Sequence, residues 1–374
     1  MKIAILTPYY VPVIGGLIYN VQTIAKKLSE RGHEVKVITC LTEESLSREM
    51  DESIDVYRIP CWHLLDKTFP VPKPSQTIAV LKDIRQWHPD IVSTQTRFFI
   101  TTLVGWMFGK CTGTPVVHTE RGSRHSVVTN PVINIISQIY DHFIGYVVTR
   151  WSSACTAVSQ QAGLFVKHLG GRQAIIIPNG IDMGMFPECA IKDNQNIIFV
   201  GRIIQAKGVQ DLIKAMSFIV QRYPEVRLTI VGGGPYLNEL KKLAADCKVG
   251  QYIEFTGPLS REDTLKRMQE SAIFVNPSYS EGLPTSVMEA SAAGLPVLAT
   301  DVGGTTEIVD NFKTGMIIEP GEYKQIRIGL ETLLYDNDLV NGMGENGRRK
   351  MEREYNWDGI ISNYEKVFQQ AFFR

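Results

Sequence analysis

The sequence lacks a net charge, paired cysteines and a long apolar run, and each absence argues against a class of protein. Its 39 Lys and Arg residues balance 39 Asp and Glu residues, so we expect no basic surface for a nucleic acid. No run of about 18 apolar residues is present, so we expect no membrane-spanning helix. The cysteines form no C-x-x-C pair, so we expect neither a zinc site nor a disulfide framework. This pattern favours a location in a reducing cytosol. The cysteines are Cys40, Cys61, Cys111, Cys155, Cys189 and Cys247.

Two further signals are absent from the sequence. There is no G-x-G-x-x-G fingerprint, which disfavours an NAD-dependent oxidoreductase. The apolar residues 1–6 are followed by Pro8 and Pro12 and by no A-x-A cleavage site, so we expect a buried strand there rather than a signal peptide. With the scattered cysteines, these features predict a cytoplasmic protein.

What the sequence does contain is an alternation of β-rich runs and amphipathic segments through most of its 374 residues. The alternation restarts at residue 197, after a polar segment, 187–196, that we interpret as a linker. Apolar strands separated by helices indicate parallel sheets covered on both faces. The predicted strands are 3–7, 35–39, 56–59, 91–94, 116–119, 155–158, 174–177, 197–200, 228–231, 253–256, 273–276, 297–299 and 316–318.

This alternation predicts an α/β fold with two doubly wound, Rossmann-like domains that face each other across a cleft. We place the N-terminal domain at residues 1–186 and the C-terminal domain at residues 196–355, followed by a final helix at 356–374. Ligands of such sheets bind beyond the carboxyl ends of the strands. Functional residues are therefore expected in the loops that follow strands.

The most informative loop follows the predicted strand 273–276. Glu281 lies in a Gly/Pro-rich loop, and Glu289 lies about one turn into the next helix. Between them lie Gly282, Leu283, Pro284 and Thr285, at a helix N-terminus, where free N–H groups favour an anion. The two carboxylates can accept hydrogen bonds from hydroxyl groups on either side of that anion. The arrangement suits a nucleotide sugar, which has sugar at both ends and phosphate in the middle.

Two cations flank the loop after the first strand of the C-terminal domain. Arg202 and Lys207 lie at the carboxyl end of that strand, where a guanidinium and an ammonium group can neutralise a diphosphate. The simpler interpretation is a pair of solvated loop cations. Their position at a strand end, where the ligand is expected, favours phosphate binding.

Two glycine loops and one histidine are weaker candidates. Gly15 and Gly16 follow the first strand, and Gly232 and Gly233 follow the strand 228–231. Glycine lets a backbone approach a phosphate closely, but both pairs also suit an ordinary strand-to-helix turn. His118 ends the strand 116–119, so it faces the expected ligand or is a hydrogen-bonded histidine at a strand end.

The Glu-x7-Glu spacing of Glu281 and Glu289 resembles that of the retaining glycosyltransferases of the two-domain GT-B fold. That group includes glycogen synthase, sucrose synthase and bacterial mannosyl- and N-acetylglucosaminyltransferases. The resemblance extends over essentially the whole chain, because other motifs follow in the family's order. These are Gly15-Gly16, His118, Asn179-Gly180 and the Arg202 and Lys207 pair.

The resemblance implies that a sugar is transferred from a nucleoside diphosphate sugar to an acceptor hydroxyl with retention of configuration. Glu289 would bind the ribose hydroxyls and Glu281 those of the donor sugar. Arg202 and Lys207 would stabilise the leaving diphosphate, and His118 would support the positive charge that develops on the sugar. The N-terminal domain would lie on the acceptor side, and the final helix would pack back on it.

The resemblance also bears on cofactors. Asp336-Asn337-Asp338 has the D-x-D spacing of a metal–diphosphate motif in other glycosyltransferases. It lies between helical segments and away from any strand end, so we interpret it as a helix cap. Because Arg202 and Lys207 supply two cations for the diphosphate, we expect no metal ion and no other cofactor.

The sequence does not decide whether the acceptor is a carbohydrate or a lipid-linked molecule. The apolar segment 127–151 is one clue, and it has two interpretations. Asp141 and His142 interrupt it, which favours a core helix, whereas an amphipathic face would dock on the inner surface of a membrane. The donor base and sugar, the linkage and the oligomeric state also stay open.

Two alternatives to transfer fit the sequence less well. A nucleotide-sugar epimerase shares the two-domain architecture but needs acid and base groups at the sugar C2, and the ordered Arg/Lys and Glu/Glu set suits transfer better. A non-catalytic nucleotide-sugar-binding protein would lack His118 and the first glycine loop, and both are present.

Overall fold

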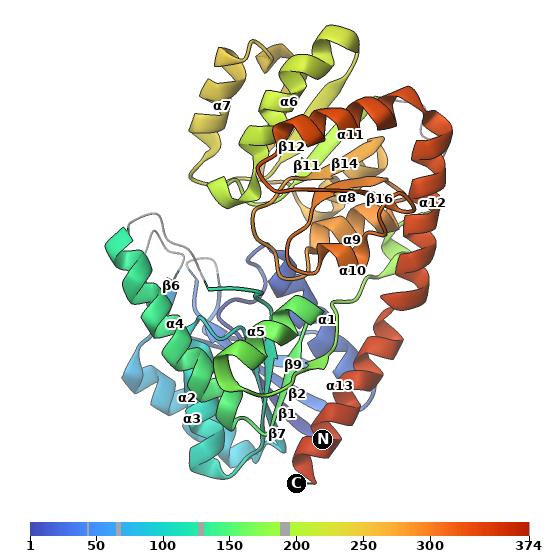
Figure 1. Cartoon of the computed structure of the whole chain (residues 1–374). Coiled ribbons are helices and arrows are strands. Elements are labelled where there is room, and N and C mark those ends of the chain that lie inside the picture. Colours follow the sequence, from blue (N-terminus) through green and yellow to red (C-terminus); the bar gives the residue numbers. More distant parts are fainter. Residues whose placement is uncertain (43–44, 65–68, 126–130, 188–194, 374) are drawn as a thin grey trace. The chain divides into compact units, whose positions relative to one another are not determined.

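The computed structural model describes residues 1–42, 45–64, 69–125, 131–187 and 195–373. The chain forms two compact units (Figure 1). The N-terminal unit comprises Met1–Asn179 together with Asp358–Arg374, and the C-terminal unit comprises Gly180–Trp357.

The N-terminal unit is built on an eight-stranded sheet in the order β10-β9-β8-β7-β1-β2-β4-β3. All neighbouring strands are parallel except β3 and β4, which are antiparallel. Strands β7 and β8 are buried along their whole length, as expected for parallel strands covered on both faces. The strands are β1 (Lys2–Leu6), β2 (Glu34–Cys40), β3 (Arg48–Asp51), β4 (Ile54–Ile59), β7 (Ile91–Gln95), β8 (Val116–Glu120), β9 (Ala154–Ala157) and β10 (Ile175–Ile176).

Helices connect most of the parallel strands of this unit, and some of them bury an apolar stripe. In α1 (Gly16–Glu30), for example, Val21, Ile24 and Leu28 recur at helical spacing and are buried. A separate antiparallel pair is formed by β5 (Cys61–Leu64) and β6 (Phe69–Pro72). The other helices are α2 (Pro74–Trp87), α3 (Ile100–Thr112), α4 (Pro131–Trp151) and α5 (Gln160–Gly170).

The last helix, α13 (Trp357–Phe372), belongs almost entirely to the N-terminal unit although it follows the C-terminal unit in sequence (Figure 1). Tyr364 and Phe368 are fully buried there. Glu365 forms an ion pair with Arg31 at 2.8 Å, and one of its oxygens lies 3.0 Å from His33 Nε2. Apolar burial and these polar contacts therefore hold α13 in place.

The C-terminal unit has a six-stranded, fully parallel sheet in the order β13-β12-β11-β14-β15-β16. Its core includes Phe199 from the sheet and Leu212 and Leu330 from the covering helices. The strands are β11 (Asn196–Val200), β12 (Arg227–Val231), β13 (Ile253–Gly257), β14 (Ile273–Asn276), β15 (Val297–Thr300) and β16 (Gly315–Ile318). The helices are α6 (Val209–Arg222), α7 (Leu237–Asp246), α8 (Arg261–Gln269), α9 (Thr285–Ala292), α10 (Thr305–Ile308), α11 (Tyr323–Tyr335) and α12 (Asn337–Glu354).

The predicted α/β fold class is confirmed, and every predicted strand has a counterpart in one of the two sheets. The sequence pattern missed β3, β5 and β6. Strand β3 is a polar edge strand, and β6 contains two prolines, so neither has the apolar run by which the other strands are recognised.

The boundary between the units differs from the predicted one. Residues 180–186, expected in the N-terminal domain, belong to the C-terminal unit. Ile181 donates a hydrogen bond from its amide to the Tyr355 carbonyl oxygen, and Arg348 donates to the Phe186 carbonyl oxygen. The predicted linker lies mostly outside the described residues, at 188–194.

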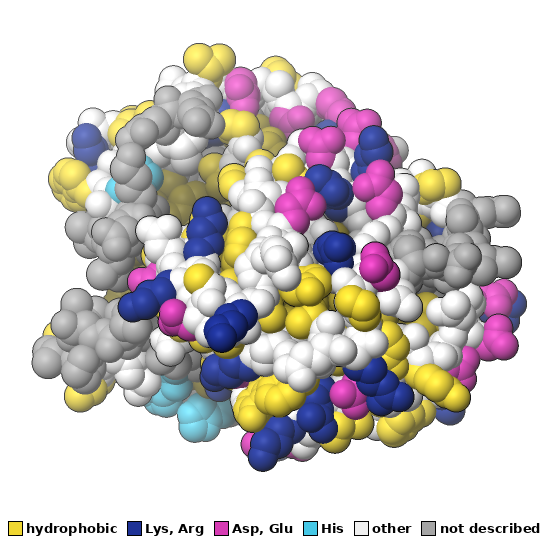
Figure 2. All heavy atoms as spheres, turned by 90° about the horizontal axis from the view of Figure 1, so that it is seen from above, with side chains coloured by type: hydrophobic (Ala, Val, Ile, Leu, Met, Phe, Trp, Pro, Cys, Tyr) yellow, Lys and Arg dark blue, Asp and Glu magenta, His cyan; other side chains and the backbone are white. Residues whose placement is uncertain are grey.

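Basic and acidic side chains are interspersed on the face drawn in Figure 2, and no large area of that face carries one sign. This mixture agrees with the balanced charge of the sequence. Within the described ranges, no helix has the length and apolar character needed to cross a membrane.

Candidate active site

The loops that carry the predicted site residues of the C-terminal unit meet at the centre of its sheet. Strands β11 and β14 are neighbours there, and the connections from them lead to opposite ends of the sheet. Such a reversal is where open α/β sheets bind ligands. The loop 201–208 follows β11 and the loop 277–284 follows β14. The Tyr279 amide donates a hydrogen bond of 2.8 Å to the Ala206 carbonyl oxygen, which joins the two loops.

Glu281 is held by polar side chains from both loops. Its Oε1 lies 2.6 Å from Lys207 Nζ and accepts a hydrogen bond of 2.7 Å from Ser278 Oγ. Asn276 Nδ2 donates to the same oxygen at 3.4 Å. The structure therefore brings together Glu281 and Lys207, which lie 74 residues apart in sequence.

Arg202 is placed differently from Lys207. Its side chain is exposed, and no hydrogen bond or ion pair within the described part of the chain engages its guanidinium group. In the loop after β11, Lys207 is therefore paired with Glu281, whereas Arg202 has no ion-pair partner among the described residues. A phosphate group could be bound by Arg202 without breaking an existing ion pair.

Glu289 lies in the second turn of α9 and is largely enclosed. Its side chain is 12% exposed, and the Nη2 atom of Arg261 lies 3.7 Å from its Oε1. Burial raises the pKa of Glu289 and Arg261 partly offsets this, so that the pKa is about 7. A carboxyl group enclosed in this way has a strong requirement for hydrogen-bond donors when it is ionised.

The turn between the two glutamates leads directly into α9. No side chain caps the N-terminus of this helix, so no capping side chain competes with an anion for its first amides. The loop after β15 supports the turn from behind, because the Gly304 amide donates a hydrogen bond of 2.7 Å to the Gly282 carbonyl oxygen. Contact of a ligand with Leu283, Pro284 and Thr285 stays a prediction.

The glycine loop after β12 has a packing role. A Cβ atom on Gly232 would lie 1.9 Å from the Gly201 carbonyl oxygen, and its φ of +137° disfavours any other residue. Gly233 has more room, because a Cβ atom there would lie 3.4 Å from its nearest neighbour, an atom of Pro258. Close packing of the two loops therefore accounts for Gly232, and a nucleotide contact by either glycine stays a prediction.

In the N-terminal unit, His118 lies on β8 and is fully buried. Its Nδ1 is 3.0 Å from Thr94 Oγ1 on β7, and its Nε2 is 3.6 Å from Glu120 Oε2. Nε2 has no hydrogen-bond partner among the residues that the structure describes. Burial agrees with a structural histidine, whereas an unsatisfied buried nitrogen suits a group that meets a ligand. The catalytic role stays a prediction.

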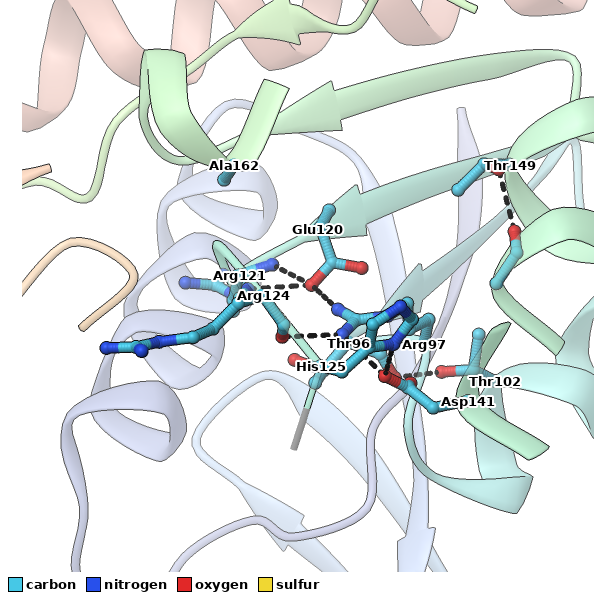
Figure 3. A network of polar contacts seen from close by, with 12 residues as sticks. Thr96, Arg97, Thr102, Glu120, Arg121, Arg124, His125, Asp141, Thr149 and Ala162 are labelled. Carbon is cyan, nitrogen blue, oxygen red and sulfur yellow. Dashed lines mark hydrogen bonds and ion pairs between the residues drawn. The ribbon is translucent and has the colours of Figure 1, made fainter. Parts of the chain in front are cut away.

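A buried ionic network surrounds the end of β8 (Figure 3). Arg97, in the loop after β7, lies 2.7 Å from Glu120 Oε1 and 2.9 Å from Asp141 Oδ2. Burial alone raises the pKa of Glu120, but Arg97, His118 and the Gly122 amide lower it to about 2. The carboxylate of Glu120 is therefore ionised at any physiological pH and holds the loop that follows it.

Sequence reasoning missed Arg97 and gave Asp141 only the role of interrupting an apolar segment. The one signal for Arg97 was its place in the loop that follows the predicted strand 91–94. The signal for Asp141 was a charge inside an apolar helix. Because a buried charge requires a partner, the two could have been paired on those grounds.

Comparison with known proteins bears on both units. Residues 14–184 match the family described as Glycosyltransferase Family 4, and residues 186–350 match the family described as Glycosyl transferases group 1. The two matches adjoin and together include nearly all of both sheets. Because each half of the chain matches a glycosyltransferase family, the chain is a glycosyltransferase.

Individual relatives of this glycosyltransferase agree with that assignment. An uncharacterized glycosyltransferase of Methanocaldococcus jannaschii is 27% identical over 99% of this chain and 98% of its own length. A GDP-mannose-dependent alpha-(1-6)-phosphatidylinositol monomannoside mannosyltransferase of Mycobacterium tuberculosis is 32% identical over 50% of this chain and 53% of its own. The solved sucrose-phosphate synthase from Thermosynechococcus elongatus superposes with a TM-score of 0.85 at 20% identity, covering 100% of this chain and 99% of that one. Its likeness confirms the GT-B fold.

Asp336 and Gly15 of the glycosyltransferase lie at the N-termini of two helices. Asp336 caps α12, because its side chain accepts a hydrogen bond of 2.9 Å from the Leu339 amide. The helix-cap interpretation of the D-x-D sequence is therefore confirmed. Gly15 is the residue before α1, which has no side-chain cap, and a Cβ there would lie 3.6 Å from Ile18. Packing does not require glycine at that position, and contact of Gly15 and Gly16 with a ligand stays a prediction.

Proposed function

We propose that this glycosyltransferase uses a nucleoside diphosphate sugar as donor and retains the anomeric configuration. The observation that carries the proposal is the group at the centre of the C-terminal sheet. There, Lys207 pairs with Glu281 at 2.6 Å, and Arg202 in the same loop is unpaired within the described ranges. The loop of Glu281 leads into α9, whose N-terminus has no side-chain cap and which carries the enclosed Glu289. The name of the mycobacterial mannosyltransferase relative, which is GDP-mannose-dependent, supports a nucleotide-sugar donor.

In this proposal each part of the donor meets a group of matching chemistry. Arg202 and the α9 amides bind the diphosphate, and Lys207 turns from Glu281 toward it as the donor enters. Glu289 accepts hydrogen bonds from the ribose hydroxyls, which offset the cost of its buried charge. Glu281, released from part of its contact with Lys207, accepts hydrogen bonds from hydroxyls of the donor sugar.

The reaction breaks the bond between the sugar C1 and the diphosphate oxygen and forms a bond from C1 to the acceptor oxygen. The acceptor hydroxyl loses its proton to the departing phosphate on the same face of the sugar, so the configuration at C1 is kept. Negative charge grows on the diphosphate as the bond breaks, and Arg202, Lys207 and the helix amides stabilise it most strongly at that stage. His118 supports the positive charge that develops on the sugar. No metal ion or other cofactor takes part in this proposal.

For the acceptor we propose a carbohydrate or lipid-linked hydroxyl, in polysaccharide, glycolipid or other glycoconjugate biosynthesis. Helix α4 supports a lipid-linked acceptor, because it is apolar on two sides. Ile144 and Val148 face the core, whereas Ile139 and Phe143 are more than 60% exposed. Peripheral contact with the inner face of a membrane would cover the exposed side.

A donor screen tests the proposed function. The melting temperature is measured with UDP, GDP and ADP, and then with sugars of the base that stabilises the protein. We expect stabilisation by one base, since a ligand that binds only the folded state raises its stability. Transfer is then assayed with free sugars and with acceptors presented in vesicles. Failure of every nucleotide to stabilise the protein would contradict the donor assignment, and conversion of the donor to its C2 epimer without transfer would favour an epimerase.

A further inference from the structure

We propose that His125, His142 and His168 of the N-terminal unit bind one divalent transition-metal ion, for which Zn²⁺ is the best match. The chain has seven histidines, and one ring nitrogen from each of these three lies within 4.8 Å of the others. The ring centroids are 5.8, 6.3 and 5.9 Å apart. Three imidazoles are the protein ligands of a well-known class of zinc site, in which water takes the fourth position.

The fold brings the three rings together from separate parts of the chain. His125 follows β8, His142 lies in α4 and His168 lies in the last turn of α5. Two glycines let α4 and α5 approach closely. A Cβ on Gly145 would lie 2.9 Å from Leu169 Cδ1, and one on Gly170 would lie 2.2 Å from Thr149 Oγ1. The cluster is therefore a consequence of tight helix packing, and it was not visible in the sequence.

Asp141 gives the cluster the outer contact that metal-binding histidines usually have. Its Oδ2 lies 2.7 Å from His125 Nδ1, and its side chain is fully buried (Figure 3). Because a carboxylate can only accept, Nδ1 carries the proton and Nε2 presents its lone pair for a metal ion. A carboxylate behind a histidine ligand orients the ring and raises its basicity.

The surroundings of the cluster also suit a cation. Asp141 shares Arg97 with Glu120, so the guanidinium group of Arg97 faces two carboxylates. Phe165 lies against two of the histidine rings, stacked on His168 at 5.9 Å and edge-on to His125 at 5.0 Å. The apolar ring limits water on that side, as in the shell around many metal sites.

Binding requires only side-chain adjustment. Zinc–nitrogen bonds of about 2.0–2.1 Å in a tetrahedral site bring the nitrogens to about 3.4 Å from one another. His142 and His168 are exposed, so both rings can rotate inward while His125 stays on Asp141. The bound ion would join the segment after β8 to α4 and α5. It lies in the N-terminal unit, whereas the groups proposed above to bind the diphosphate lie in the C-terminal unit.

Metal titration of the tag-free full chain tests the proposal. The chain is freed of metal with a chelator, the chelator is removed, and ZnCl2 is added while bound zinc is measured by equilibrium dialysis. The expected result is one zinc ion per chain and a higher melting temperature. Co²⁺ replaces Zn²⁺ in a parallel titration, because its absorption spectrum distinguishes nitrogen ligands from the thiolates of the cysteines.

Variants locate the site. His142→Ala/His168→Ala removes two exposed ligands and is expected to weaken zinc binding by at least about tenfold, with an unchanged circular dichroism spectrum. Each single variant is expected to weaken it less. His63→Ala, which removes an exposed histidine outside the cluster, serves as the control and is expected to bind zinc as the wild type does. Absence of stoichiometric zinc binding by the wild type, or equal binding by the double variant, would overturn the proposal.

Discussion

Replacing Glu289 with Gln is expected to make the C-terminal unit more stable than the wild type at alkaline pH, and this difference should shrink as the pH falls. Glu289 is 12% exposed, and burial raises the pKa of its carboxyl group from 4.5 to about 7 despite the nearby Arg261. A glutamine of nearly the same shape carries no charge at any pH. The Glu289→Gln variant therefore avoids the cost of burying a carboxylate.

The sign and size of the effect follow from proton binding. At a pH between 4.5, the pKa in the unfolded chain, and about 7, the pKa in the folded protein, Glu289 keeps its proton only in the folded state. The wild type therefore loses stability as the pH rises through this range. The difference between about 7 and 4.5, at about 1.4 kcal/mol for each pH unit, corresponds to about 3 kcal/mol above neutral pH. Below the pKa of Glu289 in the unfolded chain, both states are protonated and the charge no longer affects the stability of the wild type.

Urea unfolding of wild type and Glu289→Gln at about pH 5 and about pH 8 measures the effect. Pulsed hydrogen exchange of peptides from β11 and β14 follows the C-terminal unit by itself. The stability difference in favour of the variant should grow by about 2–3 kcal/mol between these pH values. Glu225→Gln, at an exposed position in the same unit, should show no such growth. A difference that is constant with pH, or larger at acid pH, would refute the argument.

Three other predictions concern separate parts of the two units. Arg202→Ala and Lys207→Ala should each weaken nucleoside diphosphate binding about ten- to a hundredfold, because a charge-assisted contact contributes roughly 1.5–3 kcal/mol. The loss should persist in EDTA, and a strict need for manganese or magnesium would count against it. His118→Ala should lower turnover more than diphosphate affinity; a destabilised variant with full turnover would make His118 structural. Gly232→Ala should lower the melting temperature, because its Cβ would lie 1.9 Å from the Gly201 carbonyl oxygen, and an unchanged melting temperature would be contrary to that close approach.

The central fold could be predicted because its strands are continuous apolar runs. Strand β14, for example, is buried at every position, and this follows from parallel strands being covered by helices on both faces. Strand β3 could not be predicted, because it lies at the edge of the sheet and has a polar sequence without an apolar run. Its pairing with β4 is seen only in the structure. The boundary at residue 180 depends on contacts of Ile181 and Phe186 with residues far along the chain, which no local pattern encodes.

The candidate site could be predicted as a set of residues but not as a set of contacts. Strand ends locate Glu281 and Lys207, yet only the three-dimensional structure shows that they form an ion pair. The packing role of Gly232 depends on a neighbouring loop. The Arg97–Asp141 pair and the histidine cluster combine residues from several elements, and their partners lie beyond the reach of sequence spacing.

The anomeric configuration of the transfer product tests the central claim most directly. The donor is the nucleotide sugar identified by the screen, and the product is examined by proton NMR immediately after transfer, so that the coupling constant of its anomeric proton can be compared with that of the donor. We predict the same configuration in donor and product, and loss of product formation in Glu281→Gln. An inverted product, or undiminished transfer by Glu281→Gln, would contradict the proposed retaining mechanism and the role of Glu281 in it.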